Sequence, residues 1–198
     1  MEVTLPLRTR VVVVGCSLGG MRALEVILRE LLADFPLPIA VVQHRGTEWE
    51  GQQSHLQSLL QLHTALPIVE ASDKEPLVGG RVYLAPPDYH LLVDDGSLAL
   101  SVDARVYHAR PSVDVLFESA AEAYRDGVLG VLLTGASADG TAGAQRIKAR
   151  GGTVVAQDPK TAESPIMPGA AISAGVVDRV LPLGEIAPFL NLASAPVR

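Results

Sequence analysis

The stretch RVVVVGCSLGG, residues 10–20, decides the fold class. Four consecutive valines end at Gly15, and residues 21–32 follow with apolar side chains at helical spacing. A continuous β-branched run without polar alternation is typical of a strand buried on both faces, as in a parallel sheet covered by helices. The stretch therefore predicts a buried strand, a tight turn and a helix.

The same order of strand and helix recurs along the chain. Apolar runs of strand length alternate with segments whose apolar residues have helical spacing. The expected strands are residues 10–14, 37–43, 68–69, 128–133 and 153–156, and the expected helices are residues 21–32, 52–63, 113–126, 141–150, 168–174 and 186–190. Ser112 is the expected N-cap of the third helix, and Gly127 its end. This alternation predicts right-handed crossovers and a mainly parallel α/β sheet.

The middle of the chain has a different rhythm. Residues 81–85, 90–93 and 98–102 are short strand-like runs, and residues 94–97, which read DDGS, separate the last two. Asp-Gly at this position favours a two-stranded hairpin. We therefore expect an inserted antiparallel β-hairpin beside a mainly parallel sheet that is flanked by helices.

Composition restricts the class of protein. The chain has 198 residues, 48% apolar and 19% charged, which predicts a single domain over residues 1–198 with its core at about 10–190. A formal net charge of −6 and the lack of a Lys/Arg block argue against nucleic-acid binding. No apolar run approaches the roughly twenty residues that span a bilayer. With no leader pattern and a single cysteine, Cys16, we expect a cytoplasmic protein without membrane insertion.

Three polar residues directly follow expected buried strands. They are Ser17, His44 and Asp139. In an open parallel sheet, catalysis gathers just beyond the carboxyl ends of the strands. A serine hydroxyl becomes a good nucleophile when an imidazole takes its proton, and a carboxylate fixes the tautomer of that imidazole. The three residue types therefore predict acyl transfer.

Each of the three residues has an alternative interpretation. Residues 15–19 fit the Gly-x-Ser-x-Gly pattern, in which the amide of Leu18 would donate to an oxyanion, but a phosphate-binding turn or a plain turn has similar glycines. A dinucleotide-binding fingerprint would need glycine where Ser17 stands, and a P-loop would need a Gly-Lys-Ser/Thr ending, which the sequence lacks. Both nucleotide-binding interpretations are therefore weakened. Asp139 suits an N-cap or a turn equally well, and His44 suits a structural histidine at a strand end.

Other candidate groups rank lower. His55 and His63 fall on a polar helix, His108 lies in a loop, and His90 could line a pocket but belongs to the hairpin. Cys16 is adjacent to Ser17 and should project to the other side of the strand end. The sequence has no Cys-x-x-Cys and no helical His pair, so a metal site has little support, and a hydrolysis without a cofactor fits better.

Six stretches resemble the catalytic domain of the chemotaxis protein-glutamate methylesterases, the CheB family, in the order of that family. The likeness runs from about residue 10 to about residue 190. The matching stretches are VGCSLGG (14–20), VVQH (41–44), YLAP (83–86) with His90, RPSVDVLF (110–117), LTG (133–135) with Asp139 and Gly140, and residues 151–168 from GG through AQD to MP. The nucleophile, base and acid of the family fall on Ser17, His44 and Asp139.

The resemblance implies a doubly wound parallel sheet and a serine catalytic triad. It also implies hydrolysis of γ-glutamyl methyl esters on the cytoplasmic helices of chemoreceptors, a step of chemotaxis signal transduction, with glutamine deamidation as a related activity and no cofactor. The oxyanion would rest on the amides of Leu18 and Ala136. His44 would take the proton of Ser17 and then protonate methanol.

The sequence departs from the family at two side chains and at its start. The family usually has threonine at Leu18 and methionine at Ala136, so the ester pocket differs. About nine residues precede the first expected strand, so we expect no receiver domain of the usual kind, and control by phosphorylation would be absent or would come from a separate receiver protein. The competing functions are a non-catalytic scaffold that binds signalling partners, and an esterase or amidase with another substrate.

Arg110 either contacts an acidic substrate or pairs with Asp114 on the surface.

Overall fold

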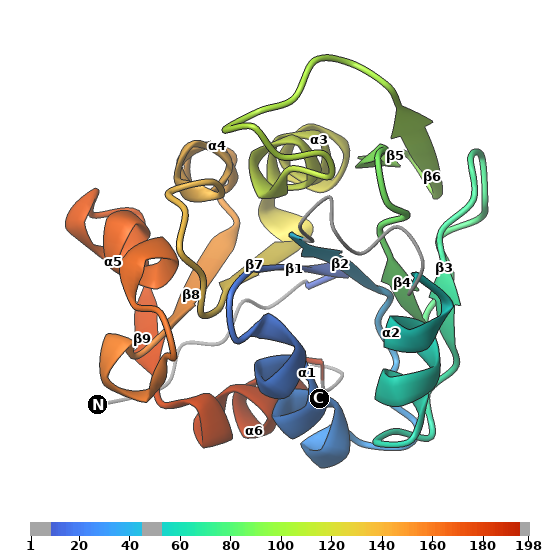
Figure 1. The fold of residues 1–198 in the computed structure, drawn as a ribbon, viewed down its shortest axis with the longest axis horizontal. Helices are drawn as coiled ribbons and strands as arrows, with labels where there is room; N and C mark the ends of the chain where they lie inside the picture. Colours follow the sequence, from blue (N-terminus) through green and yellow to red (C-terminus); the bar gives the residue numbers. More distant parts are fainter. Residues whose placement is uncertain (1–8, 45–52, 195–198) are drawn as a thin grey trace.

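The computed structural model describes residues 9–44 and 53–194, which form a seven-stranded parallel sheet between two layers of helices (Figure 1). The strand order is β3-β4-β2-β1-β7-β8-β9. The strands are β1 (Val11–Cys16), β2 (Ile39–Gln43), β3 (Ile68–Glu70), β4 (Val82–Leu84), β7 (Val128–Leu132), β8 (Thr153–Gln157) and β9 (Arg179–Leu181). Every pairing between these strands is parallel, so the predicted α/β class is confirmed.

Helices cover both faces of the sheet, which makes the fold doubly wound. The helices α1 (Gly20–Glu30), α2 (Gln53–Gln61) and α6 (Leu183–Ala193) pack on one face. The helices α3 (Val113–Tyr124), α4 (Thr141–Ala149) and α5 (Ile166–Ser173) contribute to the core on the other face. In Figure 1, α3 and α4 lie above the sheet while α1 and α6 lie below it.

The valine run forms the central strand, as expected. Val12 and Val14 belong to the core beneath α1, and Val11 and Val13 belong to the core beneath α3. β1 pairs with β2 on one side and with β7 on the other, so neither of its edges is exposed. A β-branched residue is therefore buried at each of these four positions, whichever face it points to.

The predicted hairpin is also confirmed. β5 (His90–Asp94) and β6 (Ser97–Ser101) form a separate two-stranded antiparallel sheet with Asp95 and Gly96 at the turn. Gly96 has φ 79°, a left-handed conformation that glycine adopts without strain. The hairpin packs beside α3, where the Val93 amide donates to Ser119 Oγ over 3.0 Å.

Several boundaries differ from the prediction for physical reasons. β9 was not predicted, because this short edge strand is only partly buried and Val180 is exposed, so it lacks an apolar run. α5 begins before Pro168, which the first turn of a helix tolerates because its amides are unpaired there. α6 extends on both sides of the predicted segment and contains Pro188. α3 ends at Tyr124, and a 3-10 turn at Arg125–Gly127 leads into β7.

Two further predictions concern the start of the second helix and membrane insertion. The predicted start of the second helix at Gln52 lies outside the described residues, and the described helix begins at Gln53. Among residues 9–44 and 53–194, no helix has the length and apolar character needed to cross a membrane.

Gly15 permits the close approach of α3 to β1, and its replacement tests that packing. A Cβ added at Gly15 would lie 2.2 Å from Val113 Cγ1, whereas a Cβ at Gly184 in α6 would meet nothing within 4 Å. We expect Gly15→Ala to lower the free energy of unfolding by about 1–3 kcal/mol through overpacking. The control, Gly184→Ala, should be neutral or slightly stabilising. Equal effects of both substitutions in urea unfolding would contradict this packing.

Candidate active site

Three neighbouring strand ends bring the predicted residues to one edge of the sheet. Cys16 of β1 is paired with Gln43 of β2, so Ser17 and His44 are the next residues in register. The His44 amide donates to the carbonyl of Cys16 over 3.0 Å, and the Ser17 amide donates to the carbonyl of Thr134, beyond β7, over 3.0 Å. The sheet itself therefore sets the spacing between serine and histidine.

The turn after β1 presents Ser17 at the start of α1. Gly20 opens the helix and its amide donates to the carbonyl of Ser17 over 2.8 Å. Gly19 has φ 78°, which a residue with a Cβ rarely adopts. The glycines thus serve the sharp strand-to-helix turn that the Gly-x-Ser-x-Gly pattern predicts.

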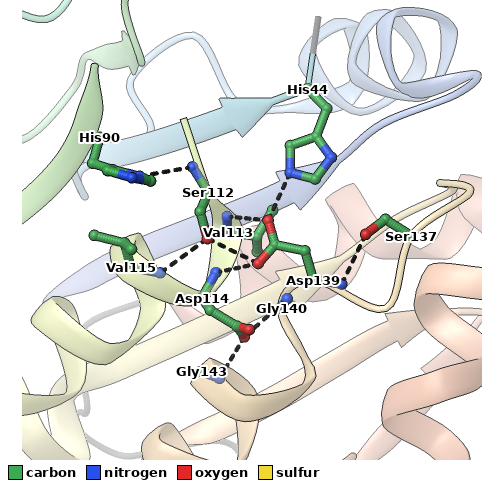
Figure 2. Close-up of polar contacts among 10 residues, drawn as sticks. All are labelled: His44, His90, Ser112, Val113, Asp114, Val115, Ser137, Asp139, Gly140 and Gly143. Atoms are coloured by element: carbon green, nitrogen blue, oxygen red, sulfur yellow. Dashed lines mark hydrogen bonds and ion pairs between the residues drawn. The ribbon is translucent and has the colours of Figure 1, made fainter. Parts of the chain in front are cut away.

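His44 and Asp139 form a direct hydrogen bond. His44 Nε2 lies 2.7 Å from Asp139 Oδ2, and the Asp139 side chain is fully buried (Figure 2). Within the described part of the chain, Nδ1 of His44 has no hydrogen-bond partner. The side chains of Ser17 and His44, although on adjacent strand ends, are not joined by a hydrogen bond. The structure therefore pairs the predicted base with the predicted acid and leaves one ring nitrogen for a nucleophile.

The start of α3 surrounds the Asp139 carboxylate with donors (Figure 2). Ser112 Oγ donates to Oδ1 over 2.9 Å, the Val113 amide to Oδ2 over 2.8 Å and the Asp114 amide to Oδ1 over 2.9 Å. Burial alone would raise the pKa of Asp139, but the hydrogen bonds from His44 and from these amides outweigh it and hold the pKa below its ordinary value. Asp139 is therefore an ionised partner for His44.

A second buried carboxylate lies beside the first, and sequence reasoning did not place it in the site. Asp114 is only 5% exposed, and its Oδ1 accepts from the amides of Gly140 over 2.9 Å and Gly143 over 2.7 Å. Burial raises the pKa of Asp114 to about 6; the charges of Asp139 and Glu118 add to the rise, and the two amides oppose it. Its position in a first helical turn predicts a capping role, but only the fold shows that it caps a different helix.

The structure does not pair Arg110 with Asp114. Arg110 instead donates to Asp88 Oδ1, 3.0 Å from Nη2, and its Nη1 donates to the carbonyls of Val102 and Asp103 over 2.7 and 3.0 Å. The expected surface pair with Asp114 is therefore wrong, because Asp114 is buried against α4. Contact between Arg110 and a substrate stays a prediction.

His90 lies beneath the site rather than on its surface. It is 1% exposed, and its Nδ1 accepts from the amide of Ser112 over 3.2 Å (Figure 2). Its Nε2 donates to the carbonyl of Ala104 over 3.1 Å. Both ring nitrogens are thus engaged with the backbone. The ring supports the turn that carries Ser112, and a role in the substrate pocket stays a prediction.

The two amides predicted to bind an oxyanion come from the turn after Ser17 and from the loop that follows β7. A Cβ added at Gly135 would lie 2.9 Å from the Cβ of Ser17, so the loop that leads to Ala136 lies directly against the serine. Gly135 is fixed in turn by Met167, whose amide donates to its carbonyl over 2.9 Å. Among residues 9–44 and 53–194, neither the amide of Leu18 nor that of Ala136 has an acceptor. Both amides are therefore unpaired.

Thr134 joins the serine turn to the loop after β8. Its Oγ1 donates to the carbonyl of Leu18 over 2.9 Å and accepts from the amide of Ser164 over 2.9 Å. Its own amide donates to Oε1 of the buried Gln157 over 2.9 Å. These contacts join segments far apart in sequence, so no local pattern in the sequence marks them.

The described residues do not support Cys16 as a nucleophile, and they form no cluster of metal-binding side chains. Cys16 packs in the core under α1 and is fully buried, which raises the pKa of its thiol to about 12. The prediction that it projects away from the site is confirmed. The described part of the chain holds no group of three or more His, Cys, Asp or Glu side chains that could bind a metal ion.

The chain has a serine, a histidine and a buried aspartate at neighbouring strand ends of a parallel sheet. This arrangement defines the class of hydrolases that are built on an open α/β sheet. A family model described as CheB methylesterase matches residues 12–190, and the chain belongs to this family. The crystal structure of the Thermotoga maritima CheB methylesterase catalytic domain is 38% identical, with a TM-score of 0.87 over 93% of this chain and 98% of that chain.

Curated relatives match nearly all of this chain. A relative from Leptospira interrogans is 46% identical over 177 residues, which are 89% of this chain and 90% of the relative. A protein-glutamate methylesterase/protein-glutamine glutaminase from Anaeromyxobacter dehalogenans is 46% identical over 179 residues, which are 90% of this chain and 52% of that protein. The chain thus spans about half the length of the second relative and most of the first.

Replacement of Asp114 by asparagine tests the electrostatics of the carboxylate pair. A folded-state pKa of about 6, against an ordinary 3.8, means that the folded protein keeps a proton that the unfolded chain has lost between these values. Stability due to this group is therefore lost as the pH rises through about 4 to 6. We expect Asp114→Asn, relative to the unaltered protein, to gain roughly 1–3 kcal/mol in free energy of unfolding between about pH 4 and about pH 7.5. A difference independent of pH in urea unfolding would contradict the raised pKa.

Proposed function

We propose that the chain is a protein-glutamate methylesterase that hydrolyses γ-glutamyl methyl esters on chemoreceptors and deamidates glutamine. The observation that carries the proposal is the 2.7 Å contact between His44 Nε2 and the buried Asp139, with Ser17 on the adjacent strand end. Family membership supports the same chemistry, because relatives from Anaeromyxobacter dehalogenans and Thermotoga maritima are named protein-glutamate methylesterase/protein-glutamine glutaminase.

In this mechanism Ser17 is the nucleophile and His44 the general base. Asp139 accepts from Nε2, so the neutral ring carries its proton there and Nδ1 is the basic nitrogen. Nδ1 takes the hydroxyl proton as Ser17 Oγ attacks the ester carbonyl, and the imidazolium is stabilised by the ionised Asp139. The Nδ1 proton then passes to the departing methoxide, which gives methanol and an acyl-serine.

Water completes the cycle by the same steps. His44 removes a proton from water, the hydroxide attacks the acyl-serine, and the proton returns to Ser17 Oγ as glutamate is released. The unpaired amides of Leu18 and Ala136 are the donors that would stabilise the oxyanion of both tetrahedral intermediates. With a glutamine substrate the leaving group is ammonia, and the remaining steps are unchanged.

The partners follow from this chemistry and from the family. The substrates would be methylated or amidated side chains on the cytoplasmic helices of chemoreceptors, which places the reaction in the cytoplasm. A phosphorylated receiver would be the regulatory partner. We treat residues 1–198 as one catalytic domain, because the two cores share a single sheet.

One observation favours a shifted substrate preference over that of a typical family member. Leu18, next to the nucleophile, is 54% exposed, so it presents an apolar side chain where the family usually has threonine. An esterase or amidase with another substrate would use the same triad. A non-catalytic scaffold would have no need for a buried, ionised Asp139 aimed at His44, because burial of a carboxylate is costly.

The first test is release of methanol from methylated chemoreceptor fragments. We expect Ser17→Ala to lower release by at least about 10³-fold at equal folded concentration, because the proposed acyl intermediate forms on the Ser17 hydroxyl. Cys16→Ala is the matched control and should retain activity, because that thiol is buried. Release by Ser17→Ala at the rate of the unaltered protein would exclude Ser17; release by neither protein would favour the scaffold.

Leu18→Thr tests the substrate-facing side chain separately from the amide. Because threonine is the residue that the family usually has here, the substitution should raise kcat/KM on receptor fragments roughly 3- to 10-fold. Hydrolysis of a small methyl ester, which needs only the amide and the triad, should stay within about two-fold. Leu62→Thr, at another exposed leucine, is the control and should change neither rate. Equal changes on both substrates would show that Leu18 acts on the nucleophile turn instead.

A further inference from the structure

Two helix starts exchange carboxylates beside the proposed triad. Asp139 precedes α4, yet its carboxylate accepts the amides of Val113 and Asp114 at the start of α3. Asp114 belongs to α3, yet its carboxylate accepts the amides of Gly140 and Gly143 at the start of α4. Each helix therefore supplies the anion that the other helix N-terminus favours (Figure 2).

α4 depends on this exchange more than α3 does. The N-cap residue of α4 is Gly140, which has no side chain to accept an amide. α3 has Ser112 as its own N-cap, and Asp139 adds to it. Without Asp114, the amides of Gly140 and Gly143 would be buried without an acceptor. Asp114 is thus the acceptor that fixes the first turn of α4.

Asp114 holds the neighbouring residue Asp139 from two sides. The Asp114 amide donates to Asp139 Oδ1 over 2.9 Å, which fixes the carboxyl group. Asp114 Oδ1 accepts from the amide of Gly140 over 2.9 Å, which fixes the peptide that follows Asp139. The other carboxyl oxygen, Asp139 Oδ2, is the one that contacts His44. The orientation of the acid toward the base therefore depends on both contacts.

We propose that Asp114 is a positioning residue for the hydrolysis: by joining α3 to the first turn of α4, it fixes the Asp139 carboxylate against His44. The inference rests on the proposed function, because it assumes that His44 and Asp139 act on Ser17. Asp114 touches neither the substrate nor the nucleophile, so it acts only through Asp139. The groups that face it are Asp139 from the loop before α4, Glu118 from its own helix, and the two glycine amides.

Two variants of Asp114 separate positioning from the mere presence of a side chain. Asp114→Ala removes the acceptor, whereas Asp114→Asn keeps an oxygen that can accept from the same two amides. Because a misplacement of about 1 Å can cost about 100-fold, we expect Asp114→Ala to lower kcat roughly 10- to 100-fold per folded molecule, with KM nearly unchanged. Asp114→Asn should restore kcat to within about three-fold of the unaltered protein.

The control is Glu118→Gln, which removes a charge one turn further along α3 without removing a contact to α4. Its kcat should match that of the unaltered protein. The proton of His44 Nε2, observed by NMR at low field, gives a second readout that overall stability does not move. It should keep its position in Asp114→Asn and Glu118→Gln, and shift or broaden in Asp114→Ala.

The outcomes separate this inference from the proposed function. If folded Asp114→Ala keeps kcat within about two-fold and leaves the His44 proton signal unmoved, the positioning role is overturned while the triad stands. If Ser17→Ala is as active as the unaltered protein, the proposed function itself fails. Should Asp114→Ala give no cooperative unfolding transition, Asp114→Ser replaces it, because a hydroxyl is too short to reach both amides; the same loss of kcat is expected, and unchanged turnover overturns the role.

Discussion

The whole catalytic edge depends on keeping one carboxylate ionised in the interior. A buried carboxylate without donors would bind a proton and could no longer orient a histidine. Asp139 escapes this because it receives hydrogen bonds from Ser112, from two amides of α3 and from His44. The start of α3 must therefore lie directly over the end of β7, and the position of that helix determines the geometry of the site.

Two glycines allow α3 to come that close. A Cβ at Gly15 would lie 2.2 Å from Val113 Cγ1, and one at Gly140 would lie 2.8 Å from the same atom. Val113 is also the residue whose amide donates to Asp139. The packing that brings this amide to the carboxylate thus requires hydrogen at both neighbouring Cα positions, one on β1 and one at the start of α4. Packing and electrostatics are coupled through a single residue of α3.

Local patterns in the sequence predicted the elements but not their mutual contacts. The valine run, the Asp-Gly turn and Ser112 each carry a local signal, and each predicted its element. β9 carries no such signal because it is a short, half-exposed edge strand. Ser17, His44 and Asp139 could be ranked because strand ends gather at one edge. The contacts of the buried Asp114 and of Thr134 join distant segments, so no local pattern places them in the site. His90 could be predicted as a possible pocket residue, but not as a buried support for the turn at Ser112.

The chemistry and the specificity of this site rest on different parts of the same residues. The carbonyl of Leu18 accepts from Thr134, and its unpaired amide lies beside Ser17, so the backbone of this residue serves the nucleophile turn. Its side chain is 54% exposed and belongs to no core. A change from threonine to leucine therefore leaves the hydrogen-bonded turn intact while it alters the surface that a substrate meets. Ala136 is also exposed and its amide is also unpaired. Because both departures from the family fall on such residues, substrate preference can diverge without loss of the backbone donors that the proposed mechanism uses.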